Sequence, residues 1–397
     1  MDPACFPQHD RFEDEPVCSR CFSDEDIAAW IENFGGRRGC AFCGKRDAPT
    51  APVDAVASHM RACLLQLYGF ADDQLPYESR EGGYQGTHWD THDLLFDELQ
   101  LDLPRSSRLY YRLPGLVGEE VWCEWDWLAL DYDEALRSAW NDFCELIKHT
   151  RRFFFMMQEA DDEGSFHPDD FPPLRLLGEI TSLIEELDLV KTIAAGTEIY
   201  RARPWGQEGG FSTARDLGPP PPHLATQANR MNPPGIPMTY AAETLDVAVC
   251  ETRRSPVSVG RFRIERPARV LDLAELPEVP GIFAGAERKY RLGLLFIHAF
   301  TREITKPVDR DERVHIDYIP SQVVTEYIRS SKIEAEYIDG IRYPSALQPR
   351  GRNLVLFASQ EEFIEPDGTP VALSDQTSEI EEPWIRLVEA TEVTLSV

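Results

Sequence analysis

The pattern of hydrophobic and polar residues differs between the two halves of the chain. Helical spacing prevails in the first half, and short strand-like runs are added in the second. Apolar residues recur at helical spacing after Asp54, at Val56, Met60, Cys63, Leu64 and Leu67. This pattern predicts a helical region over about 52–155, which includes a long helix over 138–148. Four tryptophans are predicted to anchor its core: Trp122, Trp125, Trp127 and Trp140.

Strand-like patterns are frequent in the second half. Short apolar runs predict strands over 198–203, 239–242, 257–264, 269–271 and 354–357. Helical spacing predicts helices over 174–187, 287–300 and 321–330. An acidic, proline-rich stretch over 159–173 lies between the halves and is typical of a linker. The chain is therefore expected to have an α+β fold.

One segment combines a strand, a helix and three chemically active side chains. Residues 233–235 (Pro-Pro-Gly) predict a rigid turn, and Thr244 can cap a helix that follows the strand. Arg230, Tyr240 and Glu251 surround this strand-to-helix transition. A cation, an aromatic ring and a carboxylate together suggest a nucleotide site. A buried strand followed by a capped helix would produce a similar pattern without any site.

Charge is distributed unevenly over the 397 residues, whose formal net charge is −29. Residues 1–190 carry 16 Lys+Arg against 39 Asp+Glu (−23), residues 191–350 carry 22 against 20 (+2), and residues 351–397 carry 2 against 10 (−8). The acidic first half would repel a phosphate backbone, so general nucleic-acid binding is not expected. The near-neutral segment is the expected host for an anionic ligand, and its arginines suit bidentate phosphate contacts.

Five ordered segments of the second half resemble the RES family, which is named for an arginine, a glutamate and a serine. They are Tyr200-Arg201-Ala202-Arg203, the segment TYAAETLDVAVCE that ends at Glu251, residues 318–328, the DGIRYPS segment 339–345 and the GRNLVLF segment 351–357. The resemblance assigns Arg201, Glu251 and Ser345 to the three namesake positions.

The resemblance implies a fold like that of ADP-ribosyltransferases and an NAD-degrading activity in a bacterial toxin or defence effector. In several members inorganic phosphate attacks the ribose carbon and nicotinamide leaves. Glu251 would stabilise the positive charge that builds on the ribose, Arg201 would hold phosphate or the NAD diphosphate, and Tyr240 would stack on the ligand. The remaining expected contacts are Ser345 and Asn353 as neutral hydrogen-bonding groups and Arg203 and Arg230 as anion-binding groups.

Other interpretations stay open. The same fold could transfer ADP-ribose to a macromolecule or hydrolyse NAD, and a third reading is a binding module without enzymatic activity. Tyr240 could be a core aromatic, Ser345 a turn residue and Glu251 a solvated helix carboxylate. The residue types do not show whether phosphate or water is the acceptor.

The first half resembles the HEPN-type helical domain that precedes RES domains, over roughly 16–158. Many HEPN domains are ribonucleases with an arginine followed four to six residues later by histidine, and no such spacing occurs in this half. A regulatory or interaction role is therefore expected. The expected domains are a zinc ribbon at 1–51, a HEPN-like domain at 52–158, a linker at 159–173, a RES domain at 174–360 and an acidic C-terminal extension at 361–397.

Cysteines predict a structural zinc site. Two CxxC pairs have the spacing of a four-thiolate zinc site: Cys18, Cys21, Cys40 and Cys43. Two disulfides are the alternative, but the sequence begins without the basic and apolar regions of a secretory signal. The other cysteines are expected to be buried or half-buried: Cys5, Cys63, Cys123, Cys144 and Cys250.

Location and partners are expected from the same features. No apolar stretch approaches 18 residues, so no membrane span is expected, and the chain is expected to be cytoplasmic. An NAD-degrading enzyme would harm its host, so the family resemblance leads us to expect an antitoxin or regulatory protein as partner. A homo-oligomer is also compatible with the sequence.

Overall fold

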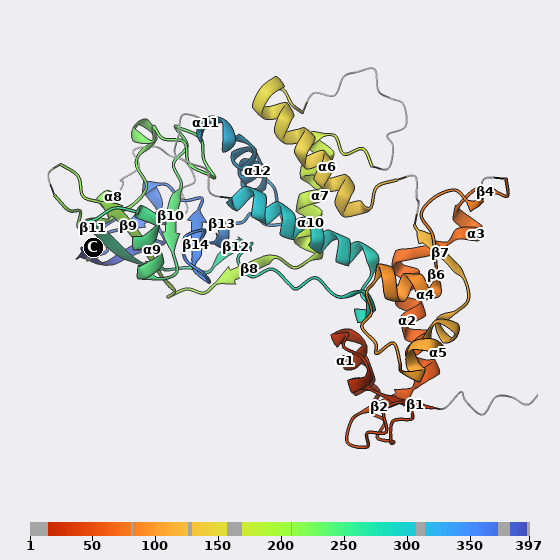
Figure 1. The fold of residues 1–397 in the computed structure, drawn as a ribbon. Helices are drawn as coiled ribbons and strands as arrows, with labels where there is room; N and C mark the ends of the chain where they lie inside the picture. The colour runs from red at the N-terminus through yellow and green to blue at the C-terminus, as the bar shows by residue number, and fades with distance from the viewer. Residues whose placement is uncertain are drawn as a thin grey trace, which may run out of the picture. The chain divides into compact units, whose positions relative to one another are not determined.

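The structure, a computed structural model, describes residues 15–80, 82–125, 129–156, 169–207, 209–306, 314–371 and 382–394. These residues form two compact units, one from residues up to 132 with 278–292 and one from 133–277 with 293 onward (Figure 1). Predictions for Cys5, Trp127 and most of the linker lie outside the described residues. None of the helices described has the length and apolar character needed to span a membrane.

The first unit combines helices of different lengths with short strands. Its helices are α1 (Glu25–Phe34), α2 (Val53–Leu67), α3 (Ala71–Gln74), α4 (Thr91–Asp93) and α5 (Arg108–Val117), with the short helices η1 (Ser19–Cys21), η2 (Leu94–Glu98) and η5 (Ile282–Ala284). Its strands are β1 (Pro16–Cys18), β2 (Thr50–Pro52), β3 (Tyr68–Phe70), β4 (Tyr77–Glu78), β5 (Gly83–Tyr84), β6 (Trp89–Asp90) and β7 (Val121–Glu124).

The helical prediction for this region was only partly right. The helix expected after Asp54 is confirmed as α2, but β3, β7 and β6 form a three-stranded sheet inside the region predicted to be helical. Trp122 lies fully buried on β7, as a core anchor should. Trp125 was wrongly predicted as a core residue, because it is 38% exposed and its indole N–H donates to the carbonyl of Leu65 at 3.2 Å.

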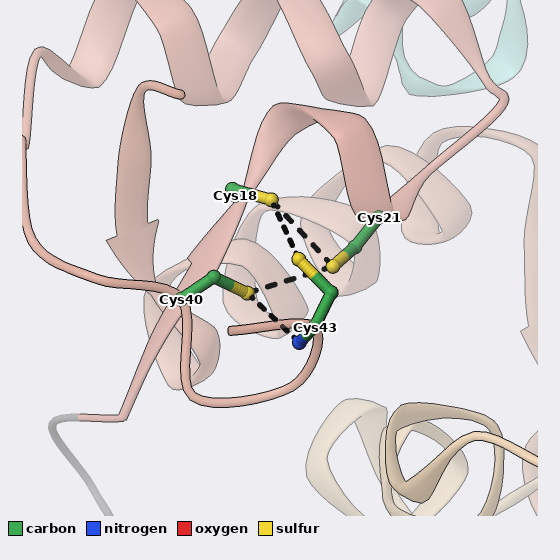
Figure 2. A group of neighbouring side chains, drawn as sticks. All are labelled: Cys18, Cys21, Cys40 and Cys43. Atoms are coloured by element: carbon green, nitrogen blue, oxygen red, sulfur yellow. Dashed lines mark hydrogen bonds between the residues drawn. The ribbon is translucent and has the colours of Figure 1, made fainter. Parts of the chain in front are cut away.

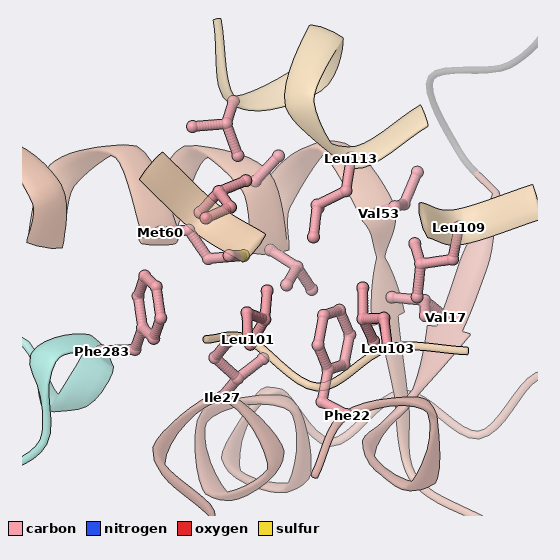
Figure 3. Close-up of a cluster of buried hydrophobic side chains, with 14 of the residues drawn as sticks. Val17, Phe22, Ile27, Val53, Met60, Leu101, Leu103, Leu109, Leu113 and Phe283 are labelled. Atoms are coloured by element: carbon pink, nitrogen blue, oxygen red, sulfur yellow. The ribbon is translucent and has the colours of Figure 1, made fainter. Parts of the chain in front are cut away.

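A segment from far along the chain completes the core of the first unit. Phe283, only 2% exposed, packs in the same apolar cluster as Ile27 and Met60 (Figure 3). His59 Nε2 lies 2.8 Å from the carbonyl oxygen of Phe283, which fixes the backbone of this segment beside α2. We call residues 278–292 the inserted segment.

Phe283→Ala is expected to lower the free energy of unfolding of the first unit by about 3–5 kcal/mol, because it leaves a cavity in a close-packed core. Chemical denaturation followed by tryptophan fluorescence measures the change. Phe34→Ala on α1 is the matched control, because Phe34 is 51% exposed. Equal losses in the two variants would contradict the role assigned to the inserted segment.

The second unit contains one nine-stranded sheet and several helices. Its helices are α6 (Tyr132–Glu145), α7 (Pro173–Glu186), α8 (Ala214–Leu217), α9 (Leu245–Thr252), α10 (Arg288–Thr305, which begins in the inserted segment), α11 (Val314–Asp317) and α12 (Ile319–Ser330), with η3 (Leu146–Thr150), η4 (Pro222–Leu224) and η6 (Gln360–Glu362). Its strands are β8 (Val190–Ile193), β9 (Glu198–Pro204), β10 (Thr239–Ala242), β11 (Val257–Ile264), β12 (Ala268–Asp272), β13 (Gly340–Pro344), β14 (Arg352–Leu356), β15 (Phe363–Ile364) and β16 (Ile385–Val393).

The nine strands form one mixed sheet in the order β15-β16-β11-β9-β10-β14-β13-β12-β8. Figure 1 labels the strands of this sheet from β11 to β8. Most neighbours are antiparallel, whereas β12 with β13 and β15 with β16 are parallel. β11 pairs with β16 from Val257↔Val393 to Ile264↔Ile385. The acidic C-terminal region therefore contributes a strand to the interior of the sheet. The prediction of an α+β fold is confirmed at this level.

Successive side chains on β10 point to opposite faces of the sheet. Ala241 packs in the apolar cluster with Phe262 and Leu354, whereas Ala242 packs against Val247 and Ala248 of α9. α9 therefore covers the face that Ala242 presents. Thr244 caps this helix as predicted, since its side chain accepts a hydrogen bond from the N–H of Val247.

Candidate functional site

The carboxylate of Glu251 is held between two side chains from the sheet. Glu251 lies near the end of α9, and its Oε1 accepts hydrogen bonds from Ser345 Oγ and from Asn353 Nδ2, each at 2.7 Å. Asn353 is on β14, and Ser345 directly follows β13. The structure thus brings together three of the residues predicted to form the site. Two donors on one oxygen fix the orientation of the carboxylate.

The register of the sheet explains why Asn353 and Ser345 lie close to Glu251. Tyr200, Ala242, Asn353 and Tyr343 are directly opposite one another across β9, β10, β14 and β13. Residues that face each other across a ladder share one face of the sheet. Because α9 covers the face of Ala242, this row faces the helix that carries Glu251.

The loop after β13 fixes Ser345. Its Oγ accepts from the backbone N–H groups of Leu347 and Gln348, each at 3.2 Å, while its hydroxyl donates to Glu251. A Cβ at Gly351 would lie 2.9 Å from Val247 Cγ2, so the absence of a side chain lets the loop approach α9. The Ser345 hydroxyl therefore has a defined direction before any ligand binds.

Arg201 lies where β9 and β10 separate. The two strands share the single pair Tyr200↔Ala242, and Arg201 Nη1 donates to the main-chain oxygen of Tyr240 at 2.7 Å. Its Nε is buried and has no hydrogen-bond partner in the described part of the chain. Burial, followed by the charge of Arg203, lowers the pKa of Arg201 to about 10, so the group remains a cation near neutral pH. No hydrogen bond or ion pair joins Arg201 to Glu251 among the described residues.

Tyr240 is tied to the loop that precedes its strand. Its hydroxyl donates to Asn232 Oδ1 at 2.7 Å and accepts from the N–H of Met231 at 3.1 Å. Burial raises the pKa of Tyr240 above its ordinary range, and Tyr343 adds to the rise. The phenol is therefore neutral and its hydroxyl is occupied, which leaves the ring as the part available to a ligand.

Arg230 has a structural contact that the sequence did not reveal. Its Nη1 donates to the carbonyls of Ile304 at 3.1 Å and Lys306 at 2.6 Å, at the C-terminal end of α10. A guanidinium there also complements the negative end of the helix dipole. Its charge still lowers the pKa of both Tyr240 and Tyr343, so it acts on the site electrostatically.

Arg203 has contacts with residues other than Glu251, Ser345 and Asn353. Its guanidinium donates to the main-chain oxygen of Asp216 and lies 4.6 Å from the centre of the Phe211 ring. These contacts attach β9 to the segment around α8. The predicted anion contact of Arg203 therefore stays a prediction.

Sequence reasoning missed Tyr343. It lies on β13 in the row with Asn353, and it is 9% exposed. Burial raises the pKa of Tyr343 above its ordinary range, Arg230 lowers it, and Glu251 and Tyr318 raise it further. Its position two residues before Ser345 was a usable signal, since alternate strand residues share a face.

The four predicted zinc ligands form one cluster in the first unit (Figure 2). Sulfur–sulfur distances are 3.7 Å for Cys18–Cys21, 3.4 Å for Cys18–Cys43 and 3.6 Å for Cys21–Cys40. Zn–S bonds of about 2.3 Å in a tetrahedron place sulfurs about 3.8 Å apart. Disulfide sulfurs would be about 2.05 Å apart, which excludes the disulfide alternative for this arrangement.

The electrostatics of the cluster fit a cation. Burial raises the pKa of Cys18 to about 11, and the neighbouring thiol of Cys43 adds to the rise. Burial also acts on Cys40, but backbone N–H groups of Cys43 and Phe42 bring the pKa of Cys40 down to about 7. Four thiolates this close require a positive ion, and the cluster could hold a structural zinc ion. The segment between the pairs contains α1, so the strands of the predicted ribbon are limited to β1 and β2.

Comparisons with known proteins find one domain family in each half of the chain. The family profile for HEPN/RES N-terminal domain 1 matches residues 33–161, and the profile for the RES domain matches residues 198–374. Neither the search of curated proteins nor the search of solved structures finds a match. The chain therefore belongs to the RES-domain proteins, a toxin-associated family, and carries the HEPN/RES N-terminal domain 1 before its RES domain.

Proposed function

We propose that this protein degrades NAD by cleaving the bond between nicotinamide and ribose, with inorganic phosphate as the acceptor, and that it acts as a toxin or defence effector. The main support is the carboxylate of Glu251, which has one oxygen fixed by Ser345 and Asn353. Its Oε2 has no hydrogen-bond partner among the described residues, so it is free to face a ligand. A fold like that of ADP-ribosyltransferases is part of this proposal.

The residue types suit the reaction. When the C–N bond breaks, its electron pair leaves with nicotinamide and the ribose carbon becomes positively charged. A fixed carboxylate stabilises that charge more than water does, because it needs no reorganisation during the reaction. A phosphate oxygen then forms the new bond to the ribose carbon, and the product is ADP-ribose carrying a phosphate.

Arg201 is proposed to hold the phosphate or the NAD diphosphate. Its buried Nε is a donor without an acceptor in the described residues, and leaving such a donor unmatched is unfavourable. An anionic ligand that binds beside this guanidinium would match its charge. Tyr240, whose main-chain oxygen anchors Arg201, places an aromatic ring nearby for stacking.

Nicotinamide release from NAD by the purified full-length chain, with and without inorganic phosphate, tests the proposal. Release is expected only with phosphate, and ³¹P NMR is expected to show a new phosphate ester. Release without phosphate would favour NAD hydrolysis, and label from NAD retained on a macromolecule would favour ADP-ribosyl transfer. Intact NAD under all conditions would favour a binding module and contradict the proposal.

Arg201→Lys is expected to reduce phosphate-dependent release about 10- to 100-fold, because it loses charge-assisted hydrogen bonds of the guanidinium fork. Initial rates at several phosphate concentrations measure the change. Arg215→Lys is the matched control, since Arg215 is exposed. Similar rates in both variants would contradict the role of Arg201.

An antitoxin or regulatory protein remains part of the proposal. Unrestrained loss of NAD would harm the cell that makes the enzyme, so a restraint is expected. The HEPN/RES N-terminal domain is the proposed place for such control, because no arginine–histidine pair of the ribonuclease spacing occurs in it.

A further inference from the structure

The hydroxyl of Tyr343 is available to a ligand although its ring is buried. The side chain is 9% exposed, and its position in the sheet is fixed by the β13–β14 pair with Asn353. Among the described residues the hydroxyl has no hydrogen-bond partner, yet its oxygen is not enclosed by protein. The Tyr343 hydroxyl is therefore a hydrogen-bond donor without a partner among these residues, and it is held by a buried ring near Glu251.

A cation, Arg230, and a carboxylate, Glu251, both act on the hydroxyl of Tyr343. Glu251 raises the pKa of Tyr343 and Arg230 lowers it, so the two groups lie within electrostatic reach of the phenol. No ion pair joins Arg230 to Glu251 in the described part of the chain, and Arg230 Nη1 is occupied by the carbonyls of α10. The neutral hydroxyl of Tyr343 and Oε2 of Glu251 are thus both without a hydrogen-bond partner among the described residues.

We propose that Tyr343 Oη and Glu251 Oε2 bind the same hydroxyl group of the ligand, a hydroxyl of the nicotinamide ribose. A carboxylate can only accept a hydrogen bond, and a phenol can donate one. A ligand hydroxyl satisfies both, because it donates to Glu251 and accepts from Tyr343. A phosphate oxygen would be repelled by the carboxylate, so it fits this position less well.

This inference rests on the proposed function for its choice of ligand, and binding can test it separately from catalysis. Tyr343→Phe keeps the ring and removes one hydroxyl. It is expected to weaken NAD binding about three- to tenfold, the effect of one neutral hydrogen bond. Isothermal titration calorimetry in phosphate-free buffer measures the dissociation constant. Tyr337→Phe is the matched control, because Tyr337 is 58% exposed.

NAD analogues that lack the 2′- or the 3′-hydroxyl of the nicotinamide ribose sharpen the test. For the analogue without the contacted hydroxyl, Tyr343→Phe should bind no more weakly than the wild-type protein, because the hydrogen bond to Tyr343 is already lost. Such non-additivity is the signature of a direct contact. An equal loss from Tyr343→Phe with NAD and with both analogues would overturn the inference.

The remaining outcomes separate the two proposals. NAD binding that depends on Tyr343 and on one ribose hydroxyl, without nicotinamide release, would support the contact and contradict NAD degradation. Nicotinamide release by the wild-type chain, together with unchanged NAD binding in Tyr343→Phe, would support NAD degradation and contradict the contact. Failure of the wild-type chain to bind NAD would overturn both.

Discussion

Glu251→Gln is expected to lower nicotinamide release from NAD by about 10²- to 10³-fold, the range seen when one preorganised electrostatic group is removed from an active site. Glutamine has the same shape and keeps a carbonyl oxygen that can accept from Ser345 and Asn353, so the local fold should survive. Only the negative charge is lost. Because that charge acts on the transition state, kcat should fall far more than the affinity for NAD.

Asp246→Asn is the matched control for this experiment. Asp246 is an exposed carboxylate on α9, the helix that carries Glu251, and its loss removes one charge from the same element. Its rate should stay close to that of the wild-type chain. If both variants lose activity equally, the effect is one of overall charge and Glu251 has no special role.

Cys40→Ser is expected to abolish tight zinc binding and to unfold much of the first unit. A structural zinc ion contributes on the order of 10 kcal/mol in small zinc domains, which is comparable to the whole stability of a domain. Cys21 and Phe42, next to the cluster, also pack against the main core of the unit, so loss of the metal would spread into that core. Metal analysis of the purified protein and hydrogen exchange localised by peptide measure the two effects.

Cys144→Ser is the control for the zinc experiment, because Cys144 is half-buried and distant in sequence from the two CxxC pairs. It should retain one zinc ion per chain. Treatment of the wild-type chain with a strong chelator should reproduce the exchange pattern of Cys40→Ser. A full zinc content in Cys40→Ser would show that the cluster is not the metal site.

Local patterns in the sequence predicted local structure well. The strand at 257–264 and the strand at 239–242 were predicted with the bounds that β11 and β10 have. The Thr244 cap was also predicted, because a cap depends on residues three positions apart. The spacing of four cysteines predicted their cluster for a similar reason, since the ligands of a zinc site follow a narrow set of spacings.

Contacts between distant segments could not be predicted in this way. The position of Tyr343 depends on the register of β10, β14 and β13, which the sequence of any one strand does not specify. The contact of Arg230 with the end of α10 joins residues more than 70 positions apart. The three-stranded sheet in the first unit was missed because strands of two to four residues are too short to show a period.

The inserted segment affects how this chain can be divided. A fragment that ends before the linker lacks Phe283, so the apolar core of the first unit is incomplete in it. A fragment that begins after the linker lacks Trp140, whose ring lies 5.0 Å from that of Phe300. Recombination at the linker would therefore give two products with incomplete cores. The HEPN/RES N-terminal domain and the RES domain of this protein are expected to be inherited and expressed as a pair rather than exchanged as independent modules.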